Sequence, residues 1–175
     1  LMHINRVLSH QIYKALLFED GSGCPPVVHA KADELAEAFL DRLGDIQSMM
    51  LKDIHAAFDG DPAARSLEEI LVCYPGIYAI FTYRVSHELF KLGVPLIPRL
   101  MSEHAHSRTG IDIGPGAQIG EYFFIDHGTG VVIGETTVIG SHAKIYQGVT
   151  LGATSTRKGQ LLAGVKRHPT LGDYV

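Results

Sequence analysis

The chain has 175 residues, of which 46% are hydrophobic and 19% charged, and its formal net charge is -4. This length is sufficient for one core, or for two small units that share one. The basic residues form no run and no apolar stretch approaches ~18 residues, so we expect neither a nucleic-acid partner nor a membrane span. Two cysteines without a CxxC pair exclude a disulfide framework, and the N-terminus has no signal pattern, so we expect a cytoplasmic protein.

The first hundred residues have the apolar spacing of amphipathic helices. An apolar stripe precedes a breaker stretch at 21–26, and a second stripe predicts one long helix. The first stripe consists of Ile4, Leu8, Ile12, Leu16 and Leu17, and the second of Leu35, Phe39, Leu43, Ile46 and Met50.

Capping signals then predict three further helices. Ser66 followed by Glu69 has the spacing of a capping box, in which the two side chains satisfy each other's backbone amides. Pro75 suits the first turn of a helix that continues over 76–92. Gly93 and Pro95 end that helix, and a last helical piece is predicted over 97–106.

The last third of the chain has a six-residue repeat. Thirteen of the 19 glycines lie between Gly110 and Gly172, and glycine costs about 0.5–1 kcal/mol inside a helix relative to alanine. A six-residue period predicts a β-solenoid in which each unit forms one side of a triangular coil, with glycine-rich β-hairpins as the alternative. The repeated aliphatic residues, with a two-residue slip after the third, are Ile113, Ile119, Ile125, Ile133, Ile139, Ile145 and Leu151.

Six motifs resemble serine acetyltransferases, a family of hexapeptide-repeat acyltransferases. The resemblance implies an α+β fold, with an all-helical N-terminal domain over 1–108 and a left-handed parallel β-helix over 109–175. The left hand rests on the resemblance alone, because most crossover connections are right-handed. The motifs are Asp59-Gly60-Asp61-Pro62, Asp112-Ile113-Gly114-Pro115-Gly116-Ala117, Ile125-Asp126-His127-Gly128-Thr129-Gly130, Val131-Val132-Ile133-Gly134-Glu135-Thr136, Tyr146-Gln147-Gly148-Val149-Thr150-Leu151-Gly152 and Arg167-His168-Pro169.

Moving an acetyl group to an alcohol requires a base for the hydroxyl proton, and histidine suits that role. We predict His127 as the base and Asp112 as the carboxylate that orients it. The two are 15 residues apart, slightly less than one 18-residue coil, so they can lie on neighbouring coils near one corner. A surface histidine at a corner is the alternative interpretation of His127.

The resemblance also implies a site for an amino-acid acceptor. Asp61 and Asp126 would bind the ammonium group, and Arg167 the carboxylate, whose two oxygens match a guanidinium. His168 would bind the carboxylate or donate to the developing oxyanion, and Glu135 is placed near the site in a catalytic or a structural role. An ordinary helix end is the alternative for Asp61.

The function that the resemblance implies is serine O-acetyltransferase, which transfers acetyl from acetyl-CoA to L-serine by direct attack in cysteine biosynthesis. It further implies a homotrimer or hexamer, L-cysteine as feedback inhibitor and no metal. The family commonly runs on for several coils and a tail that docks into O-acetylserine sulfhydrylase, so from Val175 as the last residue we expect a C-terminally truncated chain. Complex formation with the sulfhydrylase is then expected only for a longer form.

Three other functions are compatible with the repeat. A γ-carbonic anhydrase-like zinc site would need three converging histidines, for which the candidates are His127, His142 and His168. A non-catalytic scaffold built on a hexapeptide trimer is the second alternative. An acetyltransferase for homoserine or a sugar is the third, although a sugar would not need paired aspartates with an arginine.

Overall fold

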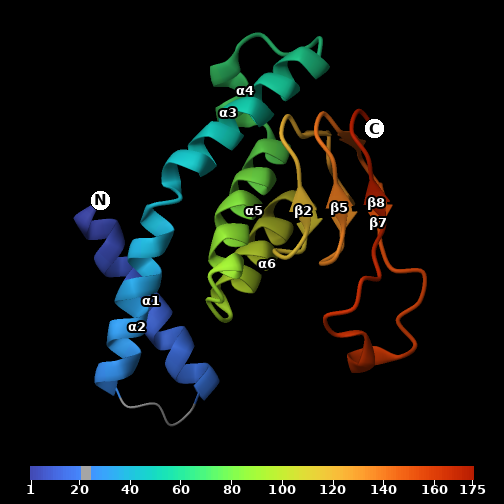
Figure 1. The fold of residues 1–175 in the computed structure, drawn as a ribbon. Helices are drawn as coiled ribbons and strands as arrows, with labels where there is room; N and C mark the ends of the chain where they lie inside the picture. Colours follow the sequence, from blue (N-terminus) through green and yellow to red (C-terminus); the bar gives the residue numbers. More distant parts are fainter. Residues whose placement is uncertain (21–24) are drawn as a thin grey trace.

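The computed structural model describes residues 1–20 and 25–175 and contains six helices followed by short parallel strands (Figure 1). Helices α1 (Met2–Asp20) and α2 (Pro25–Leu40) pack against each other. The predicted breaker stretch lies partly outside the described residues, and Pro25 already belongs to α2. Among the described helices, none combines the length and the hydropathy that a membrane crossing requires.

The second apolar stripe spans two helices, so the prediction of one long helix was wrong. A turn at Asp41 and Arg42 separates α2 from α3 (Leu43–Gly60). Arg42 keeps a right-handed backbone, and its N–H bonds the carbonyl of Phe39 at 2.9 Å, three residues back. Because the turn stays close to helical geometry, the apolar spacing continues in phase across the break.

Helix α4 (Leu67–Cys73) begins as predicted, with the Ser66 hydroxyl accepting from the Glu69 amide at 3.1 Å. The return bond differs from a capping box, because the Glu69 carboxylate accepts from the amide of Arg65 at 2.8 Å rather than from that of Ser66. Helix α5 (Pro75–Lys91) starts at the predicted proline. Helix α6 (Ile97–Thr109) is three residues longer than predicted and ends at Gly110, whose φ is 70°.

Eight short strands form three sheets in which every described pairing is parallel, and this excludes the hairpin alternative. All seven repeated aliphatic residues are buried, from Ile133 at 1% to Leu151 at 8% exposure. The first sheet contains β1 (Asp112–Ile113), β4 (Val132–Ile133) and β7 (Thr150–Leu151), the second β2 (Gln118–Ile119), β5 (Val138–Ile139) and β8 (Thr170–Leu171), and the third β3 (Phe124–Asp126) and β6 (Lys144–Tyr146).

Successive coils differ in length. Ile113 pairs with Ile133, twenty residues on, because the coil contains the two-residue slip, whereas Ile133 pairs with Leu151, eighteen residues on. A loop over 153–169, which includes the short helix η1 (Gly159–Leu162), enlarges the last coil. The chain turns at three corners. The first corner joins the first sheet to the second sheet, and the second corner joins the second sheet to the third sheet. The third corner joins the third sheet back to the first sheet.

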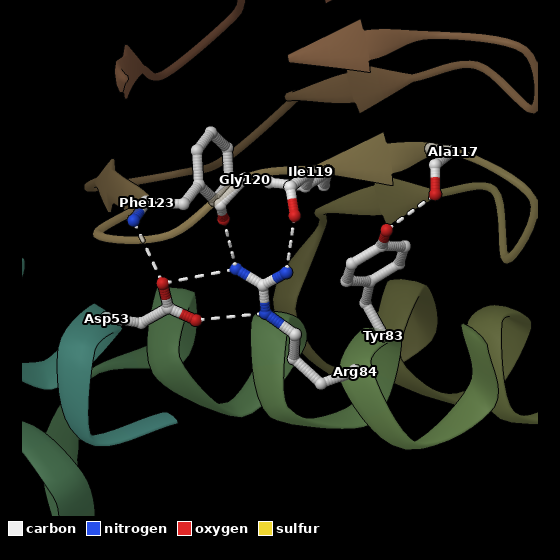
Figure 2. A network of polar contacts seen from close by, with 7 residues as sticks. All are labelled: Asp53, Tyr83, Arg84, Ala117, Ile119, Gly120 and Phe123. Atoms are coloured by element: carbon white, nitrogen blue, oxygen red, sulfur yellow. Dashed lines mark hydrogen bonds and ion pairs between the residues drawn. The ribbon is translucent and has the colours of Figure 1, made fainter. Parts of the chain in front are cut away.

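Side chains from the helices occupy the open edge of the first coil (Figure 2). Arg84, 6% exposed, donates to the carbonyls of Ile119 and Gly120 at 2.6 Å each. It also pairs with the fully buried Asp53, which accepts from the amide of Phe123 at 2.9 Å. The helices thereby satisfy backbone groups that a preceding coil would satisfy. Three more helix side chains donate to backbone carbonyls on this edge: Tyr83 to Ala117, His87 to Pro115 and Ser102 to Ile113.

Candidate functional site

Two helix ends pack closely on strand β3 and position the candidate site at the third corner. A Cβ added to Gly60, the last residue of α3, would lie 2.8 Å from Cδ1 of Phe124. A Cβ on Gly76, in the first turn of α5, would lie 2.6 Å from the carbonyl oxygen of Ile125. Only glycine permits these approaches, which bring Asp61 beside the end of β3.

Asp61 is held as an anion by the residues around it. Its carboxylate accepts from the amide of Ala63 at 2.8 Å and from the hydroxyl of Tyr74 at 2.5 Å. The bond from Tyr74 lowers the pKa of Asp61 most, the bond from the Ala63 amide is next, and the charge of Lys144 lowers the pKa further. The same bond raises the pKa of Tyr74 to about 12, so this hydroxyl remains a donor at neutral pH.

Asp126 and His127 follow each other where β3 runs into the third corner. The Asp126 carboxylate lies 3.3 Å from Nζ of Lys144 and 3.9 Å from Nε2 of His127. The His127 side chain is 74% exposed, and its φ of 58° turns the chain at the corner. The structure therefore brings Asp61, Asp126 and His127 together around one solvent-facing imidazole.

Asp112 approaches this corner without contacting His127. It begins β1, and the carbonyl of Gly110, two residues earlier, accepts from the amide of Gly130 at 2.9 Å. That bond places the start of β1 beside the chain that leaves the third corner. Over residues 1–20 and 25–175, no hydrogen bond or ion pair joins Asp112 to His127, so their pairing stays a prediction.

Arg167 and His168 lie at the first corner. Their amides both donate to the hydroxyl of Thr136, at 3.0 and 3.1 Å, and the amide of Thr136 donates to Nδ1 of His168 at 3.0 Å. Burial lowers the pKa of His168, and the charges of Arg167 and Lys166 lower it further. Because Nδ1 accepts a hydrogen bond, the neutral ring carries its proton on Nε2 and can donate from there.

Glu135 belongs to the same corner as His168. A Cβ added to Gly114 would lie 2.7 Å from Oε2 of Glu135, and one added to Gly116 would lie 2.5 Å from Oε1. The carboxylate therefore rests on two glycines, and a larger residue at position 114 would displace it. The Arg167 guanidinium donates to the carbonyls of Leu162 and Val165, in the loop before it.

One chain therefore presents the predicted site residues as two separate groups. Asp61, Asp126 and His127 lie at the third corner, with Asp112 beside it, whereas Arg167, His168 and Glu135 lie at the first corner. The face of the first sheet separates the two corners. His142 lies at the second corner, so the three histidines considered for zinc occupy three different corners. In the described part of the chain, no three His, Cys, Asp or Glu side chains gather in a way that could hold a metal ion.

Three polar residues that contact the site were missed by sequence reasoning. Only its place before Pro75 marks Tyr74 in the sequence, and that place does not indicate a contact with Asp61. Lys144 could have been found from the repeat, because the slip pairs it with Phe124 and places it diagonally beside Asp126 on the outer face of the third sheet. Thr136 lies within one of the six motifs, but its residue type alone does not indicate a role in the site.

Known proteins resemble this chain in sequence. A plasmid serine acetyltransferase of Synechococcus elongatus is 54% identical over 154 residues, which cover 86% of this chain and 48% of that protein. The serine acetyltransferase of Bacillus subtilis is 50% identical over 125 residues, 71% of this chain and 55% of the relative. The chain thus spans about half the length of the curated relatives it matches. None of the protein-family models compared with the chain matches it.

Solved structures resemble the fold over nearly its whole length. Serine acetyltransferase 1 of Entamoeba histolytica, in complex with L-cysteine, has a TM-score of 0.84 at 43% identity and covers 97% of this chain and 61% of its own. The Neisseria gonorrhoeae serine acetyltransferase, in complex with serine, has a TM-score of 0.70 at 29% identity and covers 97% of this chain and 65% of its own.

The fold and the comparisons point to the same family, the serine acetyltransferases. Six helices precede a coil of parallel strands with a hexapeptide repeat, an architecture that matches solved serine acetyltransferases. The resemblance to serine acetyltransferases predicted from the motifs is therefore confirmed.

Proposed function

We propose that the protein is a serine O-acetyltransferase, which transfers acetyl from acetyl-CoA to the hydroxyl of L-serine and gives O-acetyl-L-serine in cysteine biosynthesis. The observation that carries the proposal is the group at the third corner, where Asp61 and Asp126 lie beside the exposed imidazole of His127. Two carboxylates suit the ammonium group of an amino acid, and the imidazole suits its hydroxyl.

The residues support direct transfer without an acetyl-enzyme. His127 takes the serine hydroxyl proton as the oxygen attacks the thioester carbonyl, and Asp112 orients the imidazolium that forms. The tetrahedral oxygen accepts a hydrogen bond from Nε2 of His168, and Arg167 binds the serine carboxylate. Collapse breaks the carbon–sulfur bond, and the departing CoA thiolate takes the proton from His127. Acetyl-CoA is the co-substrate, and the steps assigned to these residues involve no metal.

A site shared between copies of the chain follows from the two corners. His127 and Arg167 belong to different corners of one chain, so one catalytic site needs the third corner of one copy and the first corner of another. A ring of three copies joined by one repeated contact meets this requirement, and pairing of two such rings through the helices gives a hexamer. We further propose a left-handed coil and a domain division into 1–108 and 109–175.

L-Cysteine is proposed as an inhibitor that occupies the serine pocket, because it differs from serine only in a thiol for the hydroxyl. The Entamoeba enzyme whose structure contains L-cysteine supports this assignment. Docking to O-acetylserine sulfhydrylase is assigned only to a longer form with a C-terminal tail.

The function is tested by free thiol release from acetyl-CoA with L-serine, with L-homoserine and without an acceptor. The assay is run on this chain and on any longer product of the same gene. We expect release that depends on serine. Release with homoserine alone would favour another acceptor, and the absence of acceptor-dependent release from both proteins would favour the scaffold function.

Sharing of the site is tested by mixing two inactive variants, His127→Asn and Arg167→Ala. Each homotrimer lacks one half of every site, whereas mixed trimers pair an intact His127 with an intact Arg167 at some contacts. After unfolding and refolding together in equal amounts, about a quarter of wild-type activity is expected from random assortment. Activity that stays at the level of the separate variants would show that one chain forms its site alone.

A further inference from the structure

Lys144 connects the two segments that carry the aspartates of the proposed serine site, without being one of the predicted site residues. Its Nζ donates to the carbonyl of Gly60 at 2.8 Å, directly before Asp61, and lies 3.3 Å from Oδ2 of Asp126. One ammonium group thus contacts both the end of α3 and the end of β3. These two segments are more than sixty residues apart in the chain.

The surroundings of Lys144 restrict where its charge can lie. Nζ is 5.0 Å from the ring centroid of Phe124 and 4.8 Å from that of Tyr146, distances at which aromatic faces attract a cation. The side chain is 31% exposed, whereas that of its partner Asp126 is 17% exposed. A cation so placed offsets the repulsion between Asp61 and Asp126 and limits the rotation of the Asp126 carboxylate.

We propose that Lys144 is a positioning residue that holds Asp61 and Asp126 at the spacing required for the ammonium group of the amino-acid substrate. The inference rests on the proposed serine acetyltransferase function and extends it by one residue. Lys144 acts through the carboxylate of Asp126 and through the carbonyl of Gly60 at the end of α3, and it takes no part in proton transfer. Its loss therefore weakens the binding of serine and of L-cysteine, which share the ammonium group, and leaves the chemical step and acetyl-CoA binding unchanged.

The test compares Lys144→Met and Lys144→Arg with a matched control, Lys52→Met. Lys52 also joins α3 to the coil, through Glu121 at 2.6 Å, and its side chain is 30% exposed. We expect Lys144→Met to raise the KM for serine about tenfold, with kcat and the KM for acetyl-CoA near wild type, and to weaken L-cysteine inhibition by the same factor. Lys144→Arg keeps the charge and recovers part of the affinity, and Lys52→Met leaves all these constants unchanged.

Several outcomes would overturn the inference. An unchanged KM for serine in Lys144→Met would remove the positioning role while leaving the proposed function intact. Equal losses in kcat and in both KM values, accompanied by a lower Tm, would indicate a structural lysine only.

Amide hydrogen exchange separates this inference from a failure of the proposed function. In the unliganded protein, we expect faster exchange over the last turn of α3 in Lys144→Met than in Lys52→Met. If the wild-type protein releases no thiol with serine, the serine part of the inference falls with the proposed function. The exchange difference then still decides whether Lys144 holds the two segments together, and equal exchange in both variants overturns that part as well.

Discussion

Replacing His127 with asparagine is expected to lower kcat for serine acetylation by about 10²–10⁴-fold, because the proposed base is lost. Asparagine is the appropriate substitution, since φ at this position is 58° and asparagine tolerates left-handed backbone better than most residues. Alanine lacks a polar side chain that helps to stabilise this backbone conformation, so its effect would combine a loss of stability with the loss of the base. The measurement is thiol release at saturating serine, together with Tm for each variant.

His142→Asn is the matched control for this experiment. His142 has nearly the same backbone conformation, with φ of 61°, and lies at the second corner between the rings of Tyr122 and Tyr174. We expect the control to keep wild-type kcat, because the second corner holds none of the proposed catalytic residues. Wild-type kcat in His127→Asn would contradict the assignment of the base, and an equal loss in both variants would attribute the effect to the coil rather than to the chemistry.

The second large effect is expected for stability in Arg84→Leu. This change leaves Asp53 as an uncompensated buried charge, which typically costs about 3–5 kcal/mol of unfolding free energy. The carbonyls of Ile119 and Gly120 lose their donors at the same time. Urea denaturation at a fixed protein concentration measures the loss.

Two further variants test why Arg84→Leu loses unfolding free energy. Arg99→Leu removes a surface pair with Glu103, and we expect it to cost at most about 1 kcal/mol. The double variant Asp53→Leu/Arg84→Leu removes the buried charge but leaves the carbonyls of Ile119 and Gly120 without their donors, so we expect only partial recovery. A double variant as stable as wild type would show that the bonds from Arg84 to the coil edge add nothing to stability.

Elements that repeat one local geometry were predicted well, whereas a break that leaves the apolar spacing in phase was not. The hexapeptide period predicted all seven buried aliphatic residues, because each unit repeats the same local geometry. The break between α2 and α3 was missed, since the turn leaves the apolar spacing in phase and hydrophobic periodicity alone does not detect it.

The sequence names residue types for the candidate site, but it does not record how the fold places them. The spacing of Asp112 and His127 suggested neighbouring coils, but the first coil spans twenty residues, from Asp112 to its strand partner Val132, so both residues lie on that one coil. Arg167 and His168 follow a loop whose path the repeat cannot predict, and this loop brings them to the first corner rather than to His127. The role of Lys144 depends on contacts across the fold, which the sequence does not record.

The helix donors on the edge of the first coil have a consequence for the register of the whole coil. A strand in a stacked coil has only its neighbouring coils to fix its register, so the first coil needs a template of another kind. Arg84, Tyr83 and Ser102 supply one, because their carbonyl partners fix which residues of the first coil face the helices. Each later coil then takes its register from the coil that precedes it. The register of every later coil therefore depends on the contacts between the helices and the first coil, although none of those later coils touches these donors.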